Sequence, residues 1–122
     1  MKAKNLFYKE CNVAGRQYHD ADEVWEELKV GTKLKLVRDL DNRFDANAVA
    51  IVYTKLEPDA TEPDEYILGY VPREENETIA KLLEMGWSDT FECRISKIVP
   101  ETHYENQLHV SIRIKRNEKE EK

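Results

Sequence analysis

Short segments in which apolar and polar residues alternate restrict the fold of this chain more than any other feature of its sequence. Every second residue from Leu108 to Ile114 is apolar, and the same holds from Phe91 to Ile95. Successive side chains of a strand point to opposite faces, so a period of two predicts strands with one buried face. Alternating or β-branched runs predict six strands, at residues 6–13, 33–37, 48–53, 66–71, 90–98 and 108–114.

Two other segments carry the signals of helices. Residues 74–85 place apolar side chains at helical spacing and are followed by Gly86, which suits the position after a helix C-terminus. Asp20 and Glu23 have the spacing of a capping box, so they predict the start of a short helix that ends before Gly31. The resulting order of elements predicts a mainly β fold: a mostly antiparallel, six-stranded barrel or rolled sheet with two helices packed outside.

A polar loop separates two of the predicted strands, between Val37 and Ala48. Its Asp and Asn side chains can each accept a hydrogen bond from a nearby backbone N–H, which predicts a loop that holds its own shape. An aromatic residue, Phe44, stands at its centre between Arg43 and Asp45. Loops on rigid strands often carry binding residues, so this loop is the first candidate site. The residues expected to shape it are Asp39, Asp41, Asn42 and Asn47.

The charge and length of the chain narrow the classes of function. The formal net charge of −6 weighs against indiscriminate nucleic-acid binding, because phosphates are neutralised by clustered Lys and Arg, but a local basic face is still compatible with it. A length of 122 residues is typical of one domain. The sequence has neither the apolar core of a signal peptide nor a run long enough to span a membrane. We therefore expect a cytoplasmic protein with no membrane partner.

Motifs for metal binding and catalysis are missing from the sequence. Cys11 and Cys93 belong to no CxxC pair, and His103 and His109 have no partner at metal-ligand spacing. The two cysteines are predicted as small buried residues, with a disulfide as the alternative. No glycine-rich phosphate loop, nucleophile elbow or Cys/His nucleophile pattern occurs. We expect a protein that is not an enzyme and binds no cofactor or metal.

Three motifs resemble those of a known family, the HIRAN domain. They are residues 15–19, residues 38–49 and residues 69–73, and they occur in the order found in that family. The resemblance covers about residues 13–114, and the central motif is its most specific part. It implies a modified six-stranded β-barrel similar to oligonucleotide-binding (OB) folds. On this basis residues 1–114 are predicted to form a single HIRAN-like domain, with residues 115–122 as a charged, disordered tail.

The resemblance also implies a function. In the best-understood members of the family the domain captures the 3′ end of single-stranded DNA during fork remodelling. A non-catalytic module that binds single-stranded DNA or DNA 3′ ends in DNA repair is therefore expected, together with a DNA-processing protein as a further partner. The alternative is a protein-interaction or regulatory module that uses an acidic surface, with DNA binding weak or lost.

Candidate site residues follow from the resemblance position by position. Tyr18 and His19 match the paired aromatic positions of the first motif. Phe44 and Asp45 match the central aromatic and the carboxylate that helps to hold the terminal 3′-hydroxyl. Structural alternatives stay open for three of them: Tyr18 packs across the barrel mouth, Phe44 pins its loop to the core, or Asp45 caps backbone N–H groups of the loop.

The third motif completes the expected pocket. Tyr70 matches the pocket wall and Arg73 a phosphate contact. Gln17 departs from the family, because DNA-binding members can place an arginine there, and His19 replaces a second tyrosine. Arg38, Arg43 and Arg73 are expected either to form a phosphate-facing patch or to stand as independent surface charges. The residues predicted to bind nucleic acid are Gln17, Tyr18, His19, Arg38, Phe44, Asp45, Tyr70 and Arg73.

Overall fold

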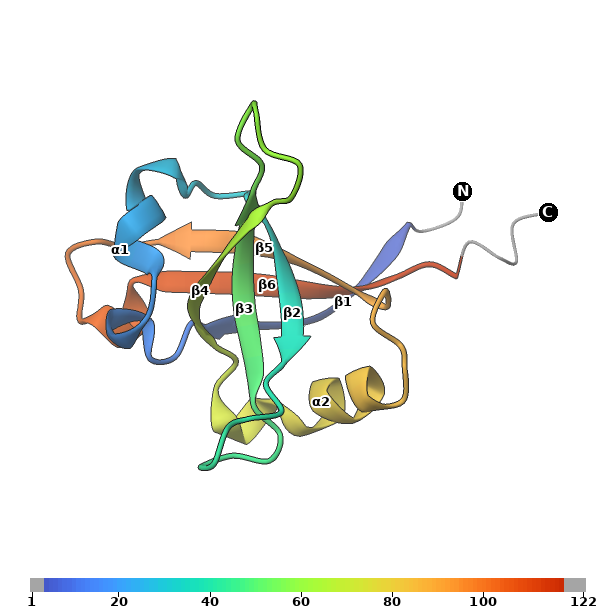
Figure 1. The fold of residues 1–122 in the computed structure, drawn as a ribbon. Helices are drawn as coiled ribbons and strands as arrows, with labels where there is room; N and C mark the ends of the chain where they lie inside the picture. Colours follow the sequence, from blue (N-terminus) through green and yellow to red (C-terminus); the bar gives the residue numbers. More distant parts are fainter. Residues whose placement is uncertain (1–3, 118–122) are drawn as a thin grey trace.

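Antiparallel strands dominate the computed structural model, which describes residues 4–117 (Figure 1). Within that range six strands pair in the order β1-β6-β5-β2-β3-β4. All six predicted strands are present, and their ends differ from the prediction by at most two residues. The strands are β1 (Asn5–Asn12), β2 (Lys33–Arg38), β3 (Val49–Lys55), β4 (Asp64–Tyr70), β5 (Phe91–Ile98) and β6 (Leu108–Lys115).

Two short α-helices lie outside the strands, as predicted (Figure 1). α2 (Glu77–Glu84) begins later than expected, because the preceding residues form a separate 3₁₀ turn, η3 (Arg73–Glu75). α1 (Ala21–Val24) continues directly into a second 3₁₀ turn, η2 (Trp25–Glu27). Two further 3₁₀ turns are η1 (Arg16–Tyr18) and η4 (Tyr104–Asn106).

The predicted capping box at the start of α1 is wrong. The Asp20 side chain makes no cap bond to its own helix. Its Oδ2 instead accepts a hydrogen bond of 3.1 Å from the backbone N–H of Ile67, and the Asp20 N–H donates to the Ile67 carbonyl at 2.8 Å. Asp20 therefore connects the start of α1 to β4. Its side chain bonds Ile67, which the tertiary fold brings close, and not a backbone N–H of its own helix.

The predicted mainly β architecture is confirmed, although the sheet is not a closed barrel. β1 and β4 are its two edges. The chain just beyond β1 meets the end of β4 in an isolated bridge between Ala14 and Tyr70. Two backbone hydrogen bonds form this bridge, one in each direction, with N to O distances of 2.8 and 2.9 Å. The bridge brings the first and third sequence motifs together.

The core lies between the curled strands and the two helices. β3 contributes four consecutive buried residues, Val49 to Val52. Cys11 and Cys93 are buried and free, as expected, and burial raises the pKa of both thiols, that of Cys11 to about 12. The largest fully buried side chains include Ile51, Leu68, Ile79, Ile95, Leu108 and Ile112.

Lys115 is the last residue of β6, and its Nζ lies 2.7 Å from Oδ1 of Asp89. Most of the predicted tail, residues 118–122, lies outside the described residues. Among residues 4–117, no helix is long and apolar enough to cross a membrane.

Candidate nucleic-acid interface

The loop between β2 and β3 holds its own shape, as predicted. Its ends are joined by a hydrogen bond of 3.0 Å from the Asp39 N–H to the Ala48 carbonyl. Inside the loop, Oδ1 of Asn42 accepts hydrogen bonds from the backbone N–H groups of Phe44 and Asp45, at 2.9 and 3.0 Å. These side-chain bonds replace the backbone pairs that a regular hairpin would supply. The tip residues are therefore fixed from within the loop.

The Asp45 carboxylate is held in place from two sides. Its Oδ1 accepts a hydrogen bond of 2.9 Å from the Asn47 N–H, so the predicted loop cap is present. Its Oδ2 accepts one of 2.8 Å from the side-chain amide of Asn76, which is 1% exposed. Arg73 approaches from η3, with its Nε 4.0 Å from Oδ2 of Asp45 and its Nη2 donating to the Phe44 carbonyl. Each carboxylate oxygen keeps a further lone pair for a ligand.

Two aromatic side chains of the candidate site are unusually exposed. Phe44 is 83% exposed and Tyr18 is 76% exposed. Both structural alternatives for these rings are therefore wrong: Phe44 does not pin its loop to the core, and Tyr18 does not pack across the barrel mouth. Both rings are open to solvent and can stack on a ligand.

His19 and Tyr70 form the wall between the first and third motifs. Their ring centroids are 5.1 Å apart, with the planes tilted by 57°. Gly15 makes this contact possible, because its φ of +70° lies in the left-handed region and lets the chain turn back. The Tyr70 hydroxyl donates a hydrogen bond of 2.7 Å to Oδ2 of Asp39 at the base of the loop. All three motifs are thus connected through Tyr70.

A pH-dependent stability is expected from Tyr70. Burial, and then its hydrogen bond to Asp39, raise the pKa of Tyr70 to about 12. An unfolded tyrosine ionises near pH 10. The stabilisation is therefore complete below about pH 10 and is lost as the pH rises towards about 12, because only the unfolded chain releases the proton there.

Urea unfolding of the wild type and Tyr70→Phe between about pH 9 and 12 measures this effect. The stability difference between the two proteins should shrink as the pH rises. Tyr18→Phe is the matched control, because the Tyr18 side chain is exposed. The stability difference between this variant and the wild type should stay constant over the same pH range. A constant difference between wild type and Tyr70→Phe would contradict the assignment.

Arg38 and Gln17 are placed less directly for binding. Arg38 donates from Nη2 to the Ala46 carbonyl at 2.9 Å, and its Nη1 lies 3.5 Å from Oε2 of Glu84 in α2. Its side chain is 15% exposed, so it anchors the loop to α2. Gln17 is exposed in η1, beside Tyr18. Of the cations of the expected patch, Arg73 is the one that the structure brings to Asp45.

Sequence reasoning missed two residues beside the site, Arg16 and Tyr104. Arg16 is 4% exposed, and its guanidinium lies 4.2 Å from the centre of the Trp25 ring and 5.3 Å from that of Tyr104. Oε2 of Glu105 accepts a hydrogen bond of 2.8 Å from the Gly15 N–H, which holds η4 against the first motif. Tyr104 is half exposed there. In the sequence, Tyr104 stands out only as an aromatic residue in a loop, next to His103.

Comparisons with known proteins give the family and the fold. The sequence model of the HIRAN domain matches residues 6–116. The chain is 31% identical over 103 residues to a Fanconi-associated nuclease 1 homolog from Oryza sativa subsp. japonica, and the match covers 84% of this chain but 9% of the rice protein. A crystal structure of a protein from Lactobacillus plantarum has a TM-score of 0.68 at 20% identity, covering 92% of this chain and 97% of that one. This last likeness shows the fold alone.

Proposed function

The chain belongs to the HIRAN domain family, and from this premise we propose that it is a non-catalytic module that binds single-stranded DNA at a free 3′ end. Family membership and the likeness to a Fanconi-associated nuclease homolog support a DNA-related binding role. The chain spans 9% of the length of that relative, and the role that we propose for it is recognition of DNA.

The observation that carries the proposal is the exposed ring of Phe44 at the position before Asp45, whose carboxylate is fixed by hydrogen bonds. A terminal base stacks on an exposed ring without the need to displace a protein contact, and such stacking contributes about 1–3 kcal/mol per base. The carboxylate accepts a hydrogen bond from the terminal 3′-hydroxyl. Since Asn47 and Asn76 already orient Asp45, little order has to be imposed on binding.

The other candidate residues supply the remaining contacts to the strand in this proposal. Arg73 lies beside Asp45 and contacts the last phosphate group. Tyr18 stacks on the next base, and the rings of His19 and Tyr70 form the wall of the pocket. With a net charge of −6 and few cations at the site, binding depends on the strand end more than on the backbone. A shallow dependence on salt is expected, because few counterions are released.

Fluorescence anisotropy with labelled oligonucleotides tests the proposal. A strand with a free 3′-hydroxyl should bind about tenfold or more tightly than the same strand with a 3′-phosphate, because the added negative charge is placed against Asp45. Asp45→Asn should reduce this ratio. Asp41→Asn is the matched control: it removes the same charge from the same loop, where the Asp41 backbone and not its carboxylate makes the described bond.

The outcomes of this experiment are distinguishable. Equal and weak binding of both oligonucleotides at low salt would contradict end recognition and favour the acidic protein-interaction module. An Asp41→Asn variant that lost discrimination as fully as Asp45→Asn would show a general charge effect in place of a contact to the hydroxyl.

A further inference from the structure

The sheet opens between β2 and β5. These strands pair only at Lys33 with Arg94 and at Leu34 with Cys93. In an antiparallel ladder every second residue points its N–H and C=O groups at the same neighbour, so the next rung would join Leu36 to Phe91. That pairing is missing in the described part of the chain. Two facing strand edges are therefore left without a ladder partner, and such edges are templates for pairing with another chain.

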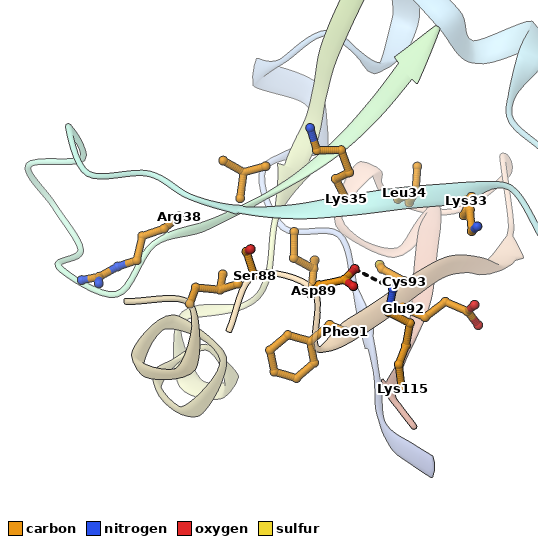
Figure 2. A pocket seen from close by; sticks show the side chains of 13 residues that line it. Lys33, Leu34, Lys35, Arg38, Ser88, Asp89, Phe91, Glu92, Cys93 and Lys115 are labelled. Carbon is orange, nitrogen blue, oxygen red and sulfur yellow. Dashed lines mark hydrogen bonds and ion pairs between the residues drawn. The ribbon is translucent and has the colours of Figure 1, made fainter. Parts of the chain in front are cut away.

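A cavity of about 800 Å³ occupies the opening, lined by both strands and by the segment before β5 (Figure 2). Binding sites for ligands commonly measure about 300–1,000 Å³. Figure 2 shows β2 along one side of the cavity, with Phe91 and Asp89 on the other. A second hollow of about 990 Å³ shares Ser88, Asp89, Glu92 and Lys115 with the first, and Trp87, which is 57% exposed, is part of its lining. The two hollows adjoin at these shared residues and are together called the groove.

Cations outnumber carboxylates in the lining of the first cavity. Four cations and the carboxylates of Asp89 and Glu92 line it, although the net charge of the chain is −6. Three of these cations have a carboxylate partner: Lys35 pairs with Glu65, Arg38 with Glu84 and Lys115 with Asp89. Lys33 forms no ion pair with any residue that the structure describes, so its charge is free to meet a ligand. The cations are Lys33, Lys35, Arg38 and Lys115.

We propose that this groove binds an extended, acidic segment of a partner protein, which adds a strand between β2 and β5. Peptide N–H and C=O groups match the two open edges, as in other cases of β-strand addition, whereas a nucleic-acid strand offers no such alternation. The open part of β2, Lys35 to Arg38, extends about 13 Å at about 3.3 Å per residue, which fits about four residues of a strand. The cations select acidic side chains, and Trp87 packs against an apolar one. This site is separate from Phe44, Asp45 and Arg73, and the proposal goes beyond DNA binding.

The test uses the full chain and a synthetic probe, a fluorescein-labelled peptide of three Glu-Val repeats. The controls are a Lys-Val peptide of the same length and the Glu-Val peptide with N-methyl groups on alternate residues, which keep its charge but remove half of its N–H donors, all on one edge of the strand. The Glu-Val peptide should bind more than about tenfold tighter than its N-methylated form. Amide signals of Leu36, Arg38 and Phe91 should shift in nuclear magnetic resonance spectra.

A matched pair of variants tests the role of charge. Lys33→Glu should weaken binding of the Glu-Val peptide about two- to fivefold, and Lys97→Glu, the same change at an exposed position of β5 outside the groove, should not. Equal binding of the N-methylated peptide, preference for the Lys-Val peptide or no saturable binding of the Glu-Val peptide below about 1 mM would overturn the proposal. So would an oligonucleotide that shifts the same three amides. Loss of 3′-end recognition alone would leave these results unchanged.

Discussion

Replacing Gly69 by alanine is expected to lower the free energy of unfolding by about 3 kcal/mol, the upper end of the range for overpacking. A Cβ atom at this position would lie 2.5 Å from the Ala14 carbonyl oxygen and 2.5 Å from Cγ1 of Val13. The Ala14 carbonyl cannot move away from the added Cβ without a loss of stability, because it accepts the 2.9 Å hydrogen bond from the Tyr70 N–H. The substitution therefore breaks the bridge that joins the ends of β1 and β4.

Urea unfolding measures the loss, and two variants identify its cause. Val13→Ala removes the side-chain part of the clash, but it leaves the backbone oxygen, so the double variant should stay strongly destabilised relative to Val13→Ala alone. Gly86→Ala is the control for the loss of a glycine, because a Cβ there meets nothing within 4 Å. Its cost should be about 1–2 kcal/mol, from positive φ alone. A Gly69→Ala variant no less stable than Gly86→Ala would refute the close-approach argument.

The strands could be predicted from the sequence because their pattern is local. In β6 every second residue from Leu108 to Ile112 is fully buried, as a period of two requires. The order of the strands could not be read in the same way. β2 pairs with β5, and the pairing covers only two residues. This arrangement depends on how the whole sheet curls and on where the segment from Asp89 to Phe91 joins it.

The loop was predictable for the same reason, and its surroundings were not. Asn42 and Asp45 bond backbone groups two or three residues away, which a sequence pattern can reveal. Asn76 bonds Asp45 across 31 residues, and nothing near either residue marks the pair. Asp41 and Asn47 also differ from the prediction, because their backbone N–H groups, and not their side chains, make the described bonds.

The burial of Arg16 could not be predicted from its charge. A charged residue in a polar motif is expected at the surface, yet Arg16 is buried under two rings and bonds Asp22 at 2.8 Å. The flat guanidinium stacks on aromatic faces, and this allows its burial. As a result, the first motif presents Tyr18 and His19 to solvent and uses its arginine for structure.

Phe44→Ala is expected to weaken binding of a 3′-hydroxyl oligonucleotide by about five- to 150-fold, which corresponds to the loss of about 1–3 kcal/mol of stacking. The side chain is exposed and outside the core cluster, so the free energy of unfolding should change by less than about 0.5 kcal/mol. Loss of binding without loss of stability would therefore report a contact to the ligand.

Leu40→Ala supplies the matched control for this prediction. Leu40 belongs to the same loop and is 81% exposed, so the change removes a similar amount of free apolar surface. It lacks a ring, however, and takes no part in the Asn42 bonds that fix Phe44 and Asp45. Anisotropy titrations should show near wild-type affinity for Leu40→Ala and greatly reduced affinity for Phe44→Ala. Equal losses in the two variants would indicate non-specific apolar contact, and the Phe44 ring would then have no special place in recognition of the strand end.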